Sequence, residues 1–141
     1  MSEYMDFYIK NENDYVPFYN CSRSNYLCGY LSSFAPTYSM PTELKENFLE
    51  TAKENVVRDA NRYKERKKIV KGLQKTAIKS GSYEMSIDLM QEIDEIEEEL
   101  ESLRYTYSKI LFLEEMVDNF RYDDNDLKLY FGIECNFESE E

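Results

Sequence analysis

The chain contains no histidine and no tryptophan, and it has only four glycines in 141 residues. Without histidine, the commonest general base and the commonest nitrogen ligand for a metal are both missing. The scattered glycines form no glycine-rich loop of the kind that holds a nucleotide phosphate. No catalytic constellation is recognisable, so the sequence predicts a non-enzymatic protein that uses no cofactor and no metal.

Long apolar runs are missing as well. No stretch of 18 consecutive apolar residues occurs, so we expect no membrane-spanning helix. The segment Met1–Asp6 is acidic and lacks an apolar core, so we expect no signal peptide. Cys21, Cys28 and Cys135 show no CxxC spacing and indicate reduced thiols of a cytoplasmic protein, with a Cys21–Cys28 disulfide as the less favoured alternative.

The charge balance is strongly acidic, with a formal net charge of −12 and a pI of about 4.5. Nucleic-acid-binding domains usually have the opposite balance, so we expect no direct binding of nucleic acid. The basic residues gather in the segment 58–79, whereas residues 84–101 include many acidic side chains and no basic one. The basic segment is either a partner for the acidic one or, as the less favoured alternative, a nucleic-acid-binding patch.

A heptad pattern between residues 89 and 117 organises the sequence. Steps of four and three residues define a stripe along one long helix, which we call the seam. Its members are Leu89, Ile93, Ile96, Leu100, Leu103, Tyr107, Ile110, Glu114 and Val117. Glu114 is its one polar break. Such a narrow apolar stripe requires a partner helix.

The partner helix is predicted over residues 42–79, with Thr42 as its N-cap. Its expected buried face holds Leu44, Phe48, Leu49, Ala52, Val56, Ala60, Tyr63, Val70, Leu73 and Ala77. Gly81 suits a left-handed position that ends this helix, and the short link through Ser82 predicts an antiparallel hairpin. In that hairpin the basic and acidic segments lie side by side and neutralise each other.

Strands are predicted at both ends of the hairpin. Residues 5–9 and 15–19 favour a β-hairpin, in which Pro17 predicts an edge strand or a bulge. A short helix over 24–34 follows, and residues 127–133 predict a strand that joins the β-hairpin. The expected fold class is therefore α+β: a long, coiled-coil-like antiparallel α-helical hairpin with a small antiparallel sheet and a short helix packed at its open end. We expect one domain, with a β-containing head (1–41 and 121–137) and a helical hairpin (42–120).

Candidate interaction residues come from the tyrosine-rich head and the acidic helix. Tyrosine combines a rigid apolar ring with a polar tip and is enriched at interfaces, although packing in a mixed core is the more general use of the residue. The candidates are Tyr15, Phe18, Tyr19, Tyr26, Tyr30, Glu95, Glu98 and Glu99. The acidic run lacks the spacing of a calcium loop, so we interpret it as a solvated helix face.

The stretch Asp6–Lys10, the polar turn and second strand after it, and Arg23–Leu31 resemble a class of small uncharacterised bacteriophage proteins. These open with a β-hairpin, continue into a short helix and carry a helical pair followed by a C-terminal strand. The likeness covers about the first 34 residues in order and the rest in layout. It implies an accessory protein that acts by binding and inhibits or modulates a host or defence protein, in the host cell cytoplasm.

Three functions are therefore expected from the sequence. The first is a non-catalytic, phage-type protein-binding module that forms a homo-oligomer. The second is an acidic nucleic-acid mimic, of the anti-CRISPR kind, that competes for a nucleic-acid-binding protein. The third is a structural oligomerisation protein.

Overall fold

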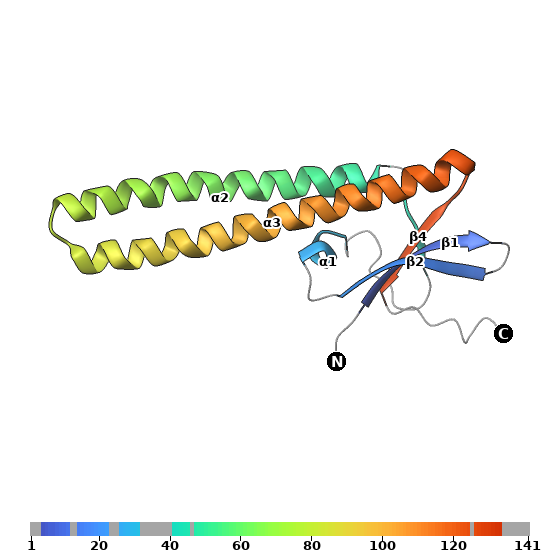
Figure 1. Cartoon of the computed structure of the whole chain (residues 1–141), viewed down its shortest axis with the longest axis horizontal. Helices are drawn as coiled ribbons and strands as arrows, with labels where there is room; N and C mark the ends of the chain where they lie inside the picture. Colours follow the sequence, from blue (N-terminus) through green and yellow to red (C-terminus); the bar gives the residue numbers. More distant parts are fainter. Residues whose placement is uncertain are drawn as a thin grey trace. The chain divides into compact units, whose positions relative to one another are not determined.

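The computed structural model describes residues 4–11, 14–22, 26–31, 41–45, 47–124 and 126–133. The fold is α+β, as the sequence predicts (Figure 1). In chain order the elements are β1 (Tyr4–Asn11), β2 (Asp14–Ser22), α1 (Tyr26–Leu31), β3 (Thr42–Glu43), α2 (Phe48–Lys79), α3 (Tyr83–Asp123) and β4 (Leu129–Ile133).

The chain divides into two compact units, and both boundaries fall inside the long helices. The sheet unit comprises Met1–Lys53 and Ser108–Glu141, and the hairpin unit comprises Glu54–Tyr107. The first turns of α2 and the last turns of α3 therefore belong with the strands, although the sequence placed them in the hairpin.

The sheet has four antiparallel strands in the order β2-β1-β4-β3. The predicted β-hairpin and the predicted C-terminal strand are confirmed, because β1 pairs with both β2 and β4. Pro17 lies on the edge strand β2, and the pairing shifts there: Phe7 is opposite Tyr19, whereas Tyr8 is opposite Pro17. Phe18 is the extra residue of this bulge, which the proline favours because it cannot donate to the ladder.

The predicted start of the first long helix is wrong. Thr42 is not an N-cap: it lies in β3 and pairs with Phe131 of β4. Leu44 extends the ladder by donating its backbone N–H to the carbonyl of Leu129 at 2.8 Å. The helix begins only at Phe48, and the carbonyl of Asn47 accepts a hydrogen bond from the N–H of Thr51. The edge of β4 offers hydrogen bonds that override the capping preference of the threonine.

Aromatic rings from strands and helices form the core of the sheet unit. Phe7 of β1 is 1% exposed, and its ring lies 4.8 Å from that of Phe131 and 6.1 Å from that of Phe48. The next layer joins β2 to α3: Phe18 contacts Phe120 and Tyr19 contacts Phe112. These contacts confirm that the sheet packs against the ends of both long helices.

The hairpin unit has a much narrower core. Helices α2 and α3 run antiparallel there (Figure 1). Val70 packs with the seam residues Ile93 and Ile96, and the partly buried residues around this cluster are Tyr63, Leu89 and Leu100. Leu73 is a correction, because it was expected on the buried face of α2 and is 49% exposed. Leu73 follows Val70 by three residues and therefore lies about 60° away from it around the helix axis, which takes it off the seam.

The turn between the helices closes as the sequence predicts. Gly81 adopts a φ of +79°, the left-handed conformation that glycine tolerates best. Its N–H donates to Ile78 at 3.2 Å, and the N–H of Ser82 donates to Ala77 at 2.9 Å. This pair of bonds is a Schellman motif, which satisfies the last carbonyl groups of α2.

In the C-terminal half of α3 the buried side shifts partly off the predicted seam, although the seam residues Ile110 and Val117 stay buried. Tyr107 and Glu114 are only half-buried, whereas Thr106 and Leu113 are buried in their place. The hydroxyl of Thr106 donates to the carbonyl of Ser102 at 2.8 Å, so its burial leaves no unsatisfied group. A straight helix turns about 20° per heptad relative to a 3.5-residue repeat, so a 41-residue helix cannot keep one strict stripe buried.

Candidate functional site

Two ion pairs between α2 and α3 define two faces of the hairpin unit. Arg66 lies 2.7 Å from Glu92, and Lys67 lies 3.0 Å from Glu97. Successive helical residues are about 100° apart, so Arg66 and Lys67 leave α2 on opposite sides of the seam. We call these sides the Arg66 face and the Lys67 face. At these two places the predicted neutralisation between the helices is confirmed.

The Arg66 face contains an acidic hollow of about 390 Å³. It is lined by Tyr63, Arg66, Glu92, Glu95, Ile96, Glu98 and Glu99. The three predicted acidic residues Glu95, Glu98 and Glu99 therefore come together here. The guanidinium of Arg66 is already paired with Glu92, whereas Glu95 and Glu98 form no ion pair among the described residues of the hairpin unit. The hollow thus has an excess of negative charge beside an aromatic ring.

Exposed apolar side chains extend the same face toward the turn. Ile69 and Leu73 follow Arg66 by three and seven residues on α2, and Met85 precedes Glu92 by seven on α3. These spacings put all of them on the stripes that carry the ion pair. Each is about half exposed. The sequence did not lead us to expect these three side chains at the surface. Their spacing of three or seven residues from Arg66 or Glu92 is the signal that could have identified them.

The Lys67 face has a second, more apolar hollow of about 220 Å³. Its lining residues are Val56, Val57, Ala60, Lys64, Leu100, Leu103, Arg104 and Tyr107. Small Ala60 is one of the lining residues, and Lys64 and Arg104 are the cations in the lining. This hollow was not foreseen from the sequence.

The predicted aromatic candidates belong to the sheet unit and divide between the two sides of its sheet. Phe18 and Tyr19 contact rings of α3, so their half-buried rings serve the packing of the unit. Tyr15 lies on the opposite side, edge-on to Tyr8 at 6.2 Å and to Tyr130 at 5.2 Å. The ammonium of Lys10 lies 5.4 Å from the Tyr15 ring centre, within reach of a cation–π contact.

This second side of the sheet has an internal polar network. The Tyr8 hydroxyl donates to Asp6 at 3.2 Å, and the Asn20 amide donates to the other oxygen of Asp6 at 2.6 Å. Of the two remaining candidates, Tyr30 is half-buried in α1 and Tyr26 is the first residue of that helix. The structure therefore places the aromatic and the acidic candidates in different units.

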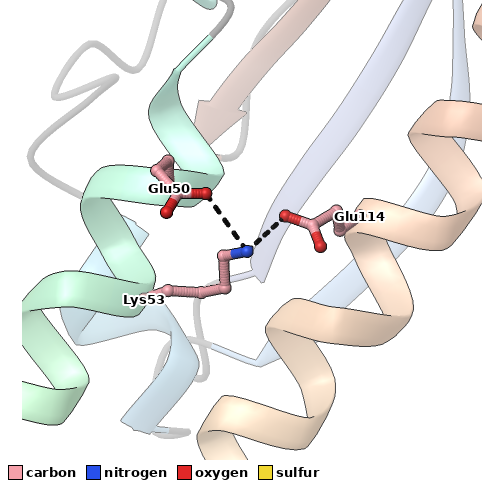
Figure 2. A network of polar contacts seen from close by, with 3 residues as sticks. All are labelled: Glu50, Lys53 and Glu114. Carbon is pink, nitrogen blue, oxygen red and sulfur yellow. Dashed lines mark ion pairs between the residues drawn. The ribbon is translucent and has the colours of Figure 1, made fainter.

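A three-residue ion network explains the polar break in the seam. Lys53 of α2 lies 2.6 Å from Glu114 and 3.2 Å from Glu50 (Figure 2). The Lys53 side chain is only 16% exposed. The hydrogen bond to Glu114, followed by that to Glu50, raises the pKa of Lys53 above its usual value against the opposing effect of desolvation. Glu114 is thus the partner of a covered lysine in the sheet unit.

Within the described ranges, no three His, Cys, Asp or Glu side chains gather as metal ligands would. Among the same residues, no helix has the length and apolarity to cross a membrane. Cys21 lies in β2 and Cys28 in α1, whereas Cys135 falls outside the described residues. Comparison of the chain with models of protein families, with curated proteins and with solved structures finds no match.

Proposed function

We propose that the protein is a non-catalytic protein-binding module whose Arg66 face receives a basic segment of another protein. The acidic hollow of that face is the observation that carries the proposal. Its carboxylates Glu95 and Glu98 form no ion pair in the hairpin unit, all of which is described, and the cation beside them, Arg66, is already paired with Glu92. An arriving lysine or arginine therefore meets unbalanced negative charge.

The chemistry of the hollow also favours a particular kind of basic segment. The half-buried ring of Tyr63 offers a surface for a cation, and the exposed Ile69 and Leu73 offer apolar contact on the same face. A partner helix with basic and apolar residues at alternate turns would satisfy both parts. Electrostatic attraction of this kind speeds association and selects the partner more than it adds raw affinity.

The resemblance of the first 34 residues to small phage proteins supports a narrower proposal about the target. The target is a host or defence protein in the cytoplasm, and binding inhibits or modulates it. A homo-oligomer, the other expected partner of this chain, stays a prediction.

Two charge-reversal variants on α3 test the binding proposal. Glu95→Lys with Glu98→Lys changes the hollow, and Asp94→Lys with Glu101→Lys makes the same charge change away from it. The probe is a fluorescently labelled helical peptide of lysine and leucine, followed by fluorescence anisotropy. We expect binding to the wild type at low salt, about tenfold weaker binding to the first variant and near-normal binding to the second, because exposed pairs contribute about 0.2–1 kcal/mol each. Equal losses in both variants would show only a response to net charge and would contradict the proposal.

A nucleic-acid mimic is the second candidate, favoured by the exposed carboxylates of Glu95 and Glu98 on one helix. In that case the basic segment of the target protein would be its binding site for the phosphate backbone of a nucleic acid. The two candidates differ in competition: duplex DNA or RNA added at constant ionic strength should release a mimic's target. A target that remains bound under these conditions, and leaves only when salt is raised, supports ordinary protein binding instead.

A further inference from the structure

The Lys67 face carries a second heptad on each long helix of the hairpin unit. On α2 the steps of four and three residues run through Ala60, Lys64, Lys67, Lys71, Gln74 and Ile78. On α3 they run through Tyr83, Ile87, Met90, Asp94, Glu97 and Glu101. The Lys67–Glu97 ion pair at 3.0 Å fixes both stripes on one side of the hairpin. Helices with two such stripes are typical of bundles that contain more than two helices.

Each stripe has an apolar end beside the turn and a charged middle. Ile78, Tyr83, Ile87 and Met90 are all at least 50% exposed. Farther from the turn, Lys64 and Lys71 on α2 lie across from Asp94 and Glu101 on α3, and none of these four forms an ion pair within the fully described hairpin unit. The face is therefore basic along one helix, acidic along the other and apolar at the turn.

We propose that a second copy of this chain packs on the Lys67 face, with both turns at the same end, and completes a four-helix bundle. A two-fold axis along the bundle places α2 of each copy against α3 of its partner. The cationic stripe then meets the anionic stripe twice, and the four apolar residues beside each turn meet their equivalents. The two helices of opposite charge cross antiparallel, as α2 and α3 do within one chain.

Charge complementarity is what selects a second copy as the occupant. A partner helix of one charge sign would match α2 or α3 and be repelled by the other. The two-fold copy presents the opposite sign to both helices at the levels where Lys64 and Lys71 face Asp94 and Glu101. The inference does not depend on the proposed function, which uses the Arg66 face.

Charge-reversed pairs test this arrangement in the full chain. Variant one, Lys64→Glu with Lys71→Glu, makes both stripes acidic, and variant two, Asp94→Lys with Glu101→Lys, makes both basic. By sedimentation equilibrium we expect the wild type to be a dimer and each variant alone to dissociate with a Kd about 100-fold higher, because symmetry doubles every reversed contact. Mixing the two variants should restore a one-to-one dimer.

Controls separate this result from misfolding and from failure of the proposed function. Circular dichroism should show the wild-type helix content for each variant alone. The Glu95→Lys, Glu98→Lys variant changes the Arg66 face and should remain a dimer while it loses the basic peptide. A monomeric wild type at about 100 µM, self-association that survives both reversals, or a mixture that stays monomeric would each overturn the inference.

Discussion

The sheet unit and the hairpin unit bury their apolar residues in different ways. In the sheet unit, rings from β2, β4 and α2 contact Phe7 of β1 from several directions. In the hairpin unit, one seam between two helices does all the packing, around Val70, Ile93 and Ile96. Two helices alone cannot enclose a wide apolar face.

The two units also differ in how many large apolar side chains they expose. Among the described residues, thirteen large apolar side chains are exposed, and nine of them lie in the hairpin unit. They are Val57, Ile69, Leu73, Ile78, Tyr83, Met85, Ile87, Met90 and Tyr105. Among the described residues, the hairpin unit therefore carries most of the exposed apolar surface, and this is the surface that the two proposed partners would cover.

The largest effect should come from the core of the sheet unit. Phe7→Ala removes a ring in contact with four others, and we expect a loss of about 3–5 kcal/mol in the free energy of unfolding of this unit. Native-state hydrogen exchange measures the two units separately, which a single melting temperature does not. Amides of β1 and β4 should lose protection, while those near Val70 and Ile93 keep most of theirs. Equal losses in both units would show that they unfold together.

Much of this contrast could be predicted from the sequence, because it follows from periodicity. The seam residues Ile93, Ile96 and Leu103 are buried as the heptad predicts, and the turn at Gly81 has the predicted conformation. The strand β3 could not be predicted, because its two residues depend on an edge of β4 that only the folded sheet provides. Local signals around Thr42 favour a helix cap equally well.

The candidate site was predictable only in part. Glu95, Glu98 and Glu99 share a hollow because of their spacing on one helix, which the sequence displays directly. The two faces could not be predicted, because they are defined by the Arg66–Glu92 and Lys67–Glu97 ion pairs. Both ion pairs depend on the register of α2 against α3. The packing contacts of the aromatic candidates Phe18 and Tyr19 with α3 could not be predicted, because the sequence alone does not reveal them.

A smaller effect is expected at the ion network of the sheet unit. Lys53→Met keeps most of the apolar stem but removes the ammonium bound to Glu114 and Glu50, and we expect a loss of about 1.5–3 kcal/mol, the usual contribution of hydrogen bonds to charged groups. Chemical denaturation at several pH values, followed by circular dichroism, measures it. Leu49→Met, a change of similar size on the same helix, is the matched control and should cost less than about 1.5 kcal/mol.

The pH dependence gives this prediction a sign. The folded pKa of Lys53 is raised, so its stabilising contribution is present in full below the unfolded value of about 10.4 and is lost as the pH rises through the higher folded value. The difference in stability between the wild type and Lys53→Met should therefore be constant from about pH 7 to 9 and shrink above about pH 10.4. A difference that grows with pH in that range would contradict the assigned contacts.

The smallest effect compares two glycines of the hairpin unit that differ only in backbone conformation. A methyl group at Gly81 or at Gly72 would meet no atom within 4 Å, so neither substitution creates a clash. Gly81 has a φ of +79°, where alanine is strained, and Gly81→Ala should lower the free energy of unfolding by about 1 kcal/mol. Gly72 lies inside α2, where alanine is the better helix former, and Gly72→Ala should raise it by about 0.5–1 kcal/mol. Thermal denaturation of both variants measures the opposite signs, and two changes of the same sign would contradict the assigned difference in backbone conformation between Gly81 and Gly72.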